Sequence, residues 1–184
     1  VCEGQALDME FNSRQDINLQ DYLNMIEKKT AWLLKTAAII GGHIGLGNEK
    51  EISALDNFAL NLGMGFQIQD DLLDLTAEEA KLGKTVGQDI LEGKKTFLII
   101  SAMAKVKNKD DKELLNKFYK DNGLPLEYVP LIKDVMYRLD VIDETEKIIE
   151  NYFKQARNYI NLLPENIYSE MLVSMLKSLD KRNY

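Results

Sequence analysis

The sequence predicts an all-α protein, and three observations support that class. Proline is rare, at three residues in 184, while leucine, isoleucine, lysine and glutamate are abundant, so long helices are favourable. Apolar residues recur at helical spacing through most of the chain. No pattern indicates a multi-stranded sheet. Because 45% of the residues are hydrophobic, the chain can bury a core, and residues 1–184 are expected to form a single helical domain.

The first residues read as part of a helix already under way. Residues 1–9 contain no initiator methionine at their start and no targeting pattern, which suggests a fragment or a chain whose N-terminal part has been removed. The first complete helix is predicted over residues 22–40, where apolar residues form one broad stripe. The pair Gly41-Gly42, together with Gly45 and Gly47, is expected to end that helix.

A second long helix is predicted over residues 51–75, although Gly63 and Gly65 lie within it. Each helical glycine costs about 1 kcal/mol relative to alanine, so a neighbouring segment is expected to pack closely there. A loop rich in glycine and lysine follows over residues 76–93. Further helices are expected over residues 95–107, 111–119 with Asp110 as the cap, 126–138, 143–163 closed by Pro164, and 167–179.

Charge and composition argue against several classes of protein. The net charge of −7 disfavours a nucleic-acid binder, which needs a basic face to neutralise phosphates. The most apolar stretch, residues 31–46, is interrupted by Lys35 and His43 and is shorter than the ~20 apolar residues of a membrane span. No membrane span is therefore expected. The single cysteine, Cys2, excludes an internal disulfide and suits a reducing, cytoplasmic location.

The most informative stretch is residues 65–75, GFQIQDDLLDL, which puts three aspartates on what otherwise reads as a buried helix face. Asp70, Asp71 and Asp74 would project from neighbouring turns, with Gln67 one turn earlier on the same side. At an effective dielectric of ~20, each close carboxylate pair costs ~4 kcal/mol, so the group should protonate, face water or bind a cation. Oxygen ligands without the glycine turn of a calcium loop favour Mg²⁺ that shares its remaining positions with phosphate.

The following loop supplies the opposite charge. Residues 82–96 read LGKTVGQDILEGKKT, in which glycines permit a close backbone approach and Lys84 and Lys94 can hold phosphate. Lys95 is expected to be an ordinary surface lysine. Lys29 and Thr30, on the earlier helix, add a possible phosphate-binding pair. An acidic stripe followed by a basic, glycine-punctuated loop predicts the wall of a diphosphate site.

Four motifs in this order resemble the C-terminal half of the trans-isoprenyl diphosphate synthases, the polyprenyl synthetase family that includes farnesyl and geranylgeranyl diphosphate synthases. GFQIQDDLLD is similar to the second aspartate-rich motif of that family, and LGKTVGQDILEGKKT to its lysine loop. KKTA at residues 28–31 is similar to its Lys-Thr pair, and GQALD at residues 4–8 to its Gly-Gln-x-x-Asp segment. A lone DDxxD is a weak signal, whereas four ordered motifs over residues 4–100 are a strong one.

The resemblance implies a class I isoprenoid synthase fold, a helical bundle around a central cavity. It also implies Mg²⁺-dependent condensation of an allylic diphosphate with isopentenyl diphosphate to a longer prenyl diphosphate. By position, Asp70 would ligate metal directly, and Asp71 and Asp74 would bind metal or its waters. The residues implied to contact the allylic diphosphate or steady the cation are Lys29, Thr30, Gln67 and Lys84. Lys94 is a further phosphate ligand, and Arg182 is placed on the isopentenyl diphosphate side.

The sequence also departs from the family pattern. The first aspartate-rich motif, the arginines beside it and the upstream residues that grip isopentenyl diphosphate have no counterpart in these 184 residues. The N-terminal helices of the bundle are therefore expected to be missing. The chain alone should bind metal–diphosphate weakly and turn over little, because half of the carboxylates that hold the metal are absent. In the family, residues just upstream of the missing motif set product length, so product length is not predicted.

Three functions stay open at this point. The first is a trans-prenyltransferase seen as its C-terminal portion. The second is a non-catalytic partner subunit of a heteromeric prenyl synthase, which the intact Asp70, Lys29 and Lys84 disfavour. The third is a class I terpene cyclase, which the lysine loop and the Lys-Thr pair disfavour. The family usually dimerises through its helices, so a homodimer is expected.

Overall fold

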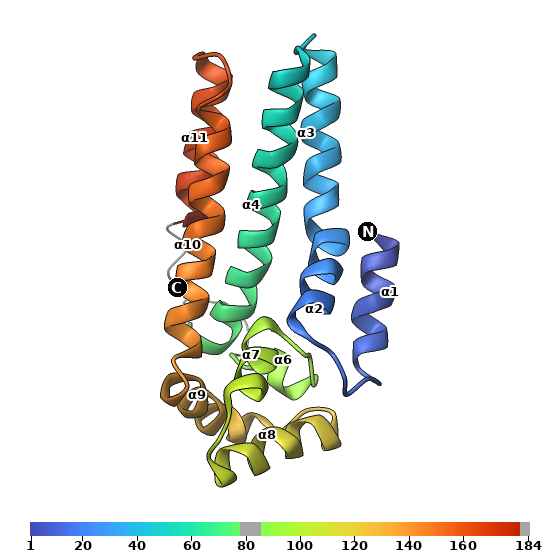
Figure 1. The fold of residues 1–184 in the computed structure, drawn as a ribbon, viewed down its shortest axis with the longest axis vertical. Coiled ribbons are helices and arrows are strands. Elements are labelled where there is room, and N and C mark those ends of the chain that lie inside the picture. Colours follow the sequence, from blue (N-terminus) through green and yellow to red (C-terminus); the bar gives the residue numbers. More distant parts are fainter. Residues whose placement is uncertain (78–85, 181–184) are drawn as a thin grey trace.

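The computed structural model describes residues 1–77 and 86–180. Within these ranges every regular element is a helix and no strand occurs, so the predicted all-α class is confirmed (Figure 1). Two predicted site residues, Lys84 and Arg182, lie outside the described residues. None of the helices in the described part of the chain is long and apolar enough to cross a membrane.

Long, roughly parallel helices stand on a base of shorter ones (Figure 1). Beside α1 (Cys2–Phe11), the chain forms a rod from α2 (Leu19–Ile26), a π-helical turn η1 (Glu27–Ala31) and α3 (Trp32–Ile44). The central helix α4 (Glu49–Thr76) packs between α3 and α10 (Val141–Ile160). The remaining elements are α6 (Gln88–Leu91), α7 (Phe97–Lys105), α8 (Lys109–Asp121), the 3₁₀ turn η2 (Leu126–Tyr128), α9 (Val129–Arg138) and α11 (Ile167–Asp180).

The helix predicted over residues 22–40 is part of a longer rod. Its start is fixed by Asn18, whose side chain accepts the backbone N–H groups of Gln20 and Asp21. Of the glycines expected to end the helix, Gly45 is its C-cap, whereas Gly41 and Gly42 lie inside α3, which continues to Ile44. A Cβ on Gly42 would lie 2.6 Å from the Cδ1 atom of Ile52 on α4, so this glycine serves helix packing instead of termination.

The long helix predicted over residues 51–75 is confirmed within two residues as α4, which is capped by Asn48. The close packing expected at its glycines is also confirmed. A Cβ on Gly63 would lie 2.6 Å from the Cα atom of Ala31 in η1, and one on Gly65 would lie 2.9 Å from the ring of Phe153 in α10. These two glycines let η1 and α10 approach α4 from different sides.

Three later boundaries differ from the prediction. Helix α8 begins at Lys109 and is capped by Asn108, not by Asp110, because the Asn108 side chain accepts the backbone N–H groups of Asp110 and Asp111. Residues 88–91, predicted as loop, form the short helix α6. Helix α10 starts two residues early, after Asp140 in the left-handed conformation (φ 55°), and ends at Ile160, before the predicted residue 163.

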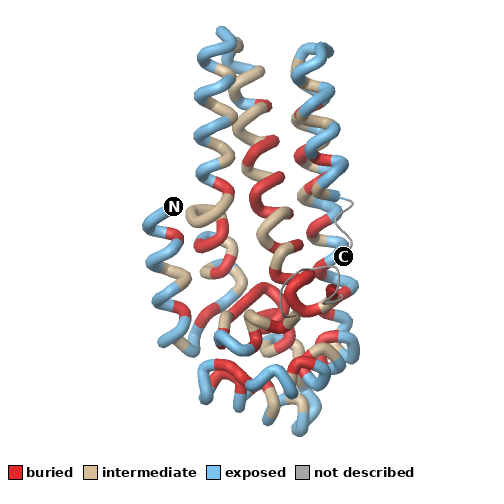
Figure 2. Tube along the Cα trace, turned by 180° about the vertical axis from the view of Figure 1, so that it is seen from behind, coloured by how far each residue is buried: buried red, intermediate tan, exposed pale blue. Residues whose placement is uncertain are grey.

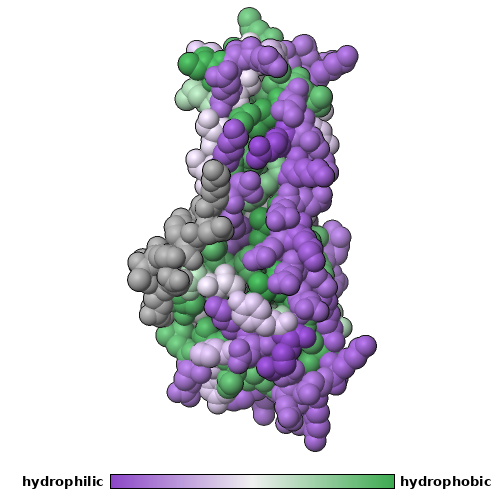
Figure 3. Space-filling model, turned by 90° about the vertical axis from the view of Figure 1, so that its left-hand side faces the viewer, coloured by the Kyte–Doolittle hydropathy of each residue, from purple (hydrophilic) through white to green (hydrophobic). Residues whose placement is uncertain are grey.

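Burial is concentrated at one end of the molecule (Figure 2). We call residues 19–31, 62–77 and 86–142 the packed end, and residues 32–61 and 154–180 the open end. The packed end contains most of the buried hydrophobic side chains. None of the described side chains of α3 is buried, although that helix is rich in apolar residues. On the side where α10 and α11 lie, hydrophilic side chains flank a recessed hydrophobic strip (Figure 3).

Candidate active site

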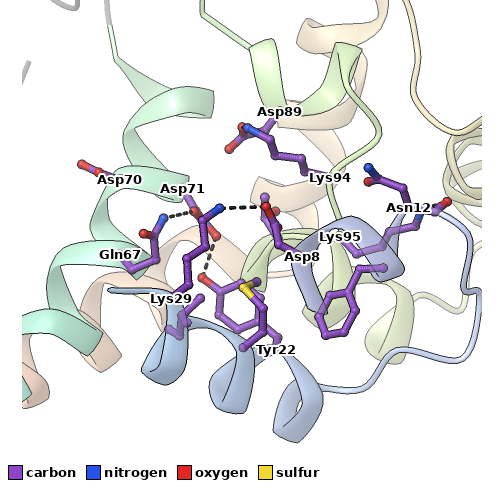
Figure 4. Close-up of a pocket in the computed structure, with 14 residues that line it drawn as sticks. Asp8, Asn12, Tyr22, Lys29, Gln67, Asp70, Asp71, Asp89, Lys94 and Lys95 are labelled. Atoms are coloured by element: carbon purple, nitrogen blue, oxygen red, sulfur yellow. Dashed lines mark hydrogen bonds and ion pairs between the residues drawn. The ribbon is translucent and has the colours of Figure 1, made fainter. Parts of the chain in front are cut away.

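A pocket at the packed end brings together side chains from α1, the α2–η1 rod, α4 and the segment around α6 (Figure 4). Its volume is about 160 Å³. Five of the predicted site residues line it: Lys29, Gln67, Asp70, Asp71 and Lys94. The pocket thus joins residues that are up to 65 positions apart in the chain. Three further charged residues line the same pocket, and they are Asp8, Asp89 and Lys95.

The first lysine of the pocket is held by α1. Lys29 Nζ lies 2.7 Å from Asp8 Oδ2, and both side chains are partly buried. Helix α1 can approach this closely because Gly4 has no side chain; a Cβ there would overlap the backbone of Lys28 and Lys29. The spacing of Gly4 and Asp8, one helical turn apart, therefore places a carboxylate against the Lys29 ammonium group.

The second lysine of the pocket is held by α6 and by the residue that follows it. Lys94 Nζ lies 2.8 Å from Asp89 Oδ1 and 3.0 Å from Glu92 Oε2. Although burial opposes it, hydrogen bonding and attraction to these two carboxylates raise the pKa of Lys94 above its ordinary value. Lys94 therefore stays protonated at neutral pH, and its positive charge suits the binding of a diphosphate.

Asp71 lies deepest among the acidic residues of the pocket. Its side chain is 8% exposed, and it accepts hydrogen bonds from Tyr22 Oη at 2.6 Å and from Gln67 Nε2 at 3.1 Å. Burial, and secondarily the charge of Asp89, raises the pKa of Asp71 to about 7, while the two hydrogen bonds oppose that rise. The sequence led us to expect that crowded carboxylates protonate, face water or bind a cation. The raised pKa of Asp71 favours protonation among these three outcomes.

The other two aspartates diverge from Asp71. Asp70 lines the pocket and points away from the Asp71–Tyr22 pair (Figure 4). Asp74 is 2% exposed, and its Oδ2 atom accepts the backbone N–H of Asp89 at 2.9 Å. Its backbone carbonyl accepts the N–H of Gly87. In this arrangement Asp74 ties the start of α6 to α4, and its assignment as a metal ligand stays a prediction.

The donor set of the pocket fits Mg²⁺ as a half-site. Among the described residues, no three acidic, histidine or cysteine side chains are grouped so as to enclose a metal ion. The carboxylates of Asp70, Asp71 and Asp89 nevertheless line one cavity together with three lysines. Mg²⁺ in proteins commonly keeps several waters and is bound by one or two carboxylates together with substrate phosphates, which this lining can provide.

Comparison with known proteins identifies the family of this chain. Residues 1–129 match the polyprenyl synthetase family. The chain belongs to that family. The resemblance inferred from four motifs is therefore confirmed, and the matched residues include every motif that carried it.

Named polyprenyl synthetases are similar over most of this chain. The geranylgeranyl diphosphate synthase of Sulfolobus acidocaldarius is 39% identical over 161 residues, which are 88% of this chain and 48% of that protein. A short chain isoprenyl diphosphate synthase of Methanothermobacter thermautotrophicus is 33% identical over all of this chain and 56% of its own length. The crystal structure of geranylgeranyl pyrophosphate synthetase from Pyrococcus horikoshii superposes with a TM-score of 0.89 at 36% identity, covering 99% of this chain and 55% of that one. The chain thus spans about half the length of the relatives it matches, and the predicted isoprenoid synthase fold is confirmed.

Sequence reasoning missed or misjudged three residues of this polyprenyl synthetase pocket. Lys95 is not a surface lysine: it is 4% exposed and donates to the carbonyl of Asn12 at 3.1 Å and to Asn122 Oδ1 at 2.9 Å. Asp89 lies inside the quoted lysine loop and was not singled out. Tyr22 carried no signal at all, because its partner Asp71 is 49 residues away along the chain.

Proposed function

We propose that this chain supplies half of the catalytic site of a trans-prenyltransferase. Such an enzyme condenses an allylic diphosphate with isopentenyl diphosphate and releases a longer prenyl diphosphate. The observation that carries the proposal is the convergence of four sequence motifs on one cavity of about 160 Å³. Three lysines stand there beside four carboxylates, as binding of a metal–diphosphate requires.

Two of these lysines bind the diphosphate in this proposal. Lys29 and Lys94 are ion-paired with Asp8 and Asp89, respectively, so both positive charges are already oriented before substrate arrives. Diphosphate binding draws each ammonium group toward phosphate oxygens and releases part of the carboxylate charge toward the pocket. Lys84 and Arg182, outside the described residues, keep their predicted roles toward the allylic and isopentenyl diphosphates.

The metal ligands in this proposal are Asp70, Asp71 and Asp74. Asp70 and Asp71 line the pocket, whereas Asp74 is the more remote member. Mg²⁺ held there supplies positive charge that stabilises the departing diphosphate. Around it, the protein excludes water and aligns the lysines before the allylic carbon–oxygen bond breaks.

Thr30 and Gln67 lie on the carbocation side of the pocket. The Thr30 hydroxyl donates to Gln67 Oε1 at 2.8 Å, so its proton is already engaged. With its proton engaged, the Thr30 hydroxyl presents oxygen lone pairs to a ligand, and these attract a positive carbon and repel phosphate. Of the two roles predicted for this pair, steadying the allylic cation therefore fits the geometry better.

Three wider expectations belong to the same proposal. Residues 1–184 form one helical domain, supported by a hydrophobic cluster that draws on residues from Phe11 to Leu176. The protein is a cytoplasmic homodimer. The chain alone turns over little, because it spans about half the length of its relatives. The paired lysines beside the acidic residues favour chain elongation over both a non-catalytic partner subunit and a terpene cyclase.

The test is a chimera in which this chain replaces the stretch it matches in the Sulfolobus acidocaldarius synthase. The chimera is incubated with Mg²⁺, isopentenyl diphosphate and dimethylallyl, geranyl or farnesyl diphosphate, with the parent synthase as control. We expect an elongated product whose formation depends on isopentenyl diphosphate. A cyclic product formed without isopentenyl diphosphate would instead indicate a cyclase. A folded chimera that is inactive alone, and active only when mixed with a complete subunit, would indicate a partner subunit.

A further inference from the structure

A buried tyrosine lies behind the acidic residues of the pocket. Tyr22 is 1% exposed, and its ring packs edge-on against Phe97 with centroids 5.9 Å apart. A phenylalanine would satisfy that apolar contact equally well. Burying a hydroxyl group is unfavourable unless it is hydrogen-bonded, and the Tyr22 hydroxyl donates to Asp71 Oδ2 at 2.6 Å. The hydroxyl group is therefore directed at the carboxylate of α4.

The bond from Tyr22 fixes how Asp71 meets its second partner. An ionised carboxylate only accepts hydrogen bonds, so the neighbouring amide must present its NH₂ group to Asp71. Gln67 does so, with Nε2 at 3.1 Å from Asp71 Oδ1. A flipped amide would bring two oxygen atoms together, and the anchored carboxylate cannot turn away to relieve that repulsion.

The orientation of Gln67 in turn determines the hydrogen bond at the π-helical turn. With Nε2 directed to Asp71, the Oε1 atom of Gln67 faces η1, where it accepts the Thr30 hydroxyl at 2.8 Å. The turn itself is held in place by close packing of Ala31 on Gly63. A directional chain of hydrogen bonds thus runs from Tyr22 in α2 through Asp71 and Gln67 in α4 to Thr30 in η1.

We propose that Tyr22 is a positioning residue of the active site: by anchoring Asp71, its hydroxyl fixes the side-chain amide of Gln67 and the direction of the Thr30 hydroxyl. The inference deepens the proposed function, since the oxygen atoms it orients are those assigned to the carbocation side. Its structural part, the coupling of Tyr22 to Gln67, can be measured without turnover. Failure of the proposed function and failure of this inference are therefore distinguishable.

The first experiment is ¹H–¹⁵N NMR of the side-chain amides of the folded protein, which reports on the Gln67 amide directly. The Gln67 pair is identified as the pair missing from a Gln67→Met spectrum. In Tyr22→Phe we expect this pair to shift and to exchange its protons with solvent several-fold faster. Asp71→Asn replaces one of the two accepting oxygens by an NH₂ group, so the side chain can no longer accept from both Tyr22 and Gln67, and the same pair should move. Tyr159→Phe is the matched control, because it removes a tyrosine hydroxyl from a half-buried site on α10 at the open end.

An unchanged Gln67 pair in both Tyr22→Phe and Asp71→Asn, with backbone spectra that show a folded protein, would overturn the proposal. So would an equal shift in Tyr159→Phe. The second experiment places Tyr22→Phe in the chimera and measures kinetics. We expect kcat to fall roughly 10- to 100-fold, as is typical for partners behind a metal ligand, with little change in KM for the allylic diphosphate. A loss confined to KM would assign Tyr22 to substrate binding and contradict the positioning role.

Discussion

The packed end and the open end of this molecule share the helices α4 and α10 yet treat polar groups differently. At the packed end, α2 and the second half of α4 bury Tyr22, Asp71 and Asp74, each within a hydrogen-bonded arrangement. At the open end, α3 buries none of its described side chains and exposes large apolar residues such as Ile44 and Leu46 beside it. The comparison shows that the site forms where segments lock around α4, since burial there makes each polar contact directional.

Glycine positions account for much of this difference. Gly63 at the packed end, and Gly4 on the adjoining α1, let α4 and α1 approach the π-helical turn at backbone distance. At the open end, Gly41 has no described atom within 4 Å of the position a Cβ would take. Gly63 is therefore a requirement of packing, whereas Gly41 is only a source of backbone freedom in its helix.

The largest effect we predict is on metal–diphosphate binding. Asp70→Ala in the chimera should weaken Mg²⁺-dependent binding of inorganic diphosphate by at least about tenfold, or 1.4 kcal/mol, because a pocket carboxylate is lost. Isothermal titration calorimetry with and without Mg²⁺ measures this. Asp56→Ala is the control from the open end of the same helix, where Asp56 pairs with Lys35 at 3.2 Å. Equal losses in the two variants would break the distinction between the two ends.

The next effect is on stability at the packed end. Gly63→Ala places a methyl group 2.6 Å from the Cα atom of Ala31, and a backbone atom cannot move away as a flexible side chain could. We expect the free energy of unfolding to fall by about 1–3 kcal/mol, despite the higher helix propensity of alanine. Urea unfolding monitored by far-UV circular dichroism tests this. A Gly63→Ala protein as stable as the wild type would mean that η1 does not depend on close packing.

The corresponding change at the open end should have the opposite sign. Gly41→Ala introduces a methyl group into open space within α3 and removes a flexible residue from a helix interior. We expect a gain of about 0.5–1 kcal/mol in the free energy of unfolding, measured by the same urea titration. A loss of stability would show that a segment packs on this face of α3 in solution.

Sequence reasoning succeeded where local rules decide the outcome. Helix periodicity gave α4 within two residues, and the glycines inside it correctly indicated close neighbours. It failed where a distant partner decides. Gly42 continues a helix because Ile52 packs on it, and Lys95 is buried because Asn12 and Asn122 accept its hydrogen bonds. Neither partner can be identified from spacing along the chain.

The candidate site shows the same division. The motifs predicted that Lys29, Asp70 and Lys94 belong to one site, and these three residues do line one pocket. Helical spacing also predicted that Asp74 would share the face of Asp71. In the structure Asp74 and Asp71 do line one small cavity, and the Oδ2 atom of Asp74 also accepts the backbone N–H of Asp89, a contact created by the path of the chain after α4. The direction in which each carboxylate of the cluster points thus depends on tertiary contacts, which helical spacing alone does not include.

The smallest effect we predict concerns pH and compares two lysines, one from each end. Burial lowers the pKa of Lys95 below its ordinary 10.5, so in the window just below 10.5 the unfolded chain binds more protons than the folded one. Stability contributed by this group therefore rises with pH through that window and is lost again as the pH falls through the folded pKa. The stability of the wild type relative to Lys95→Met should accordingly increase as the pH rises toward 10.5 in urea unfolding. Lys154→Met, at an exposed position on α10, should leave the pH slope of the wild type intact. If Lys95→Met kept that slope as well, the Lys95 ammonium group would be solvated in the folded protein, and the packed end would not exclude water from its lysines.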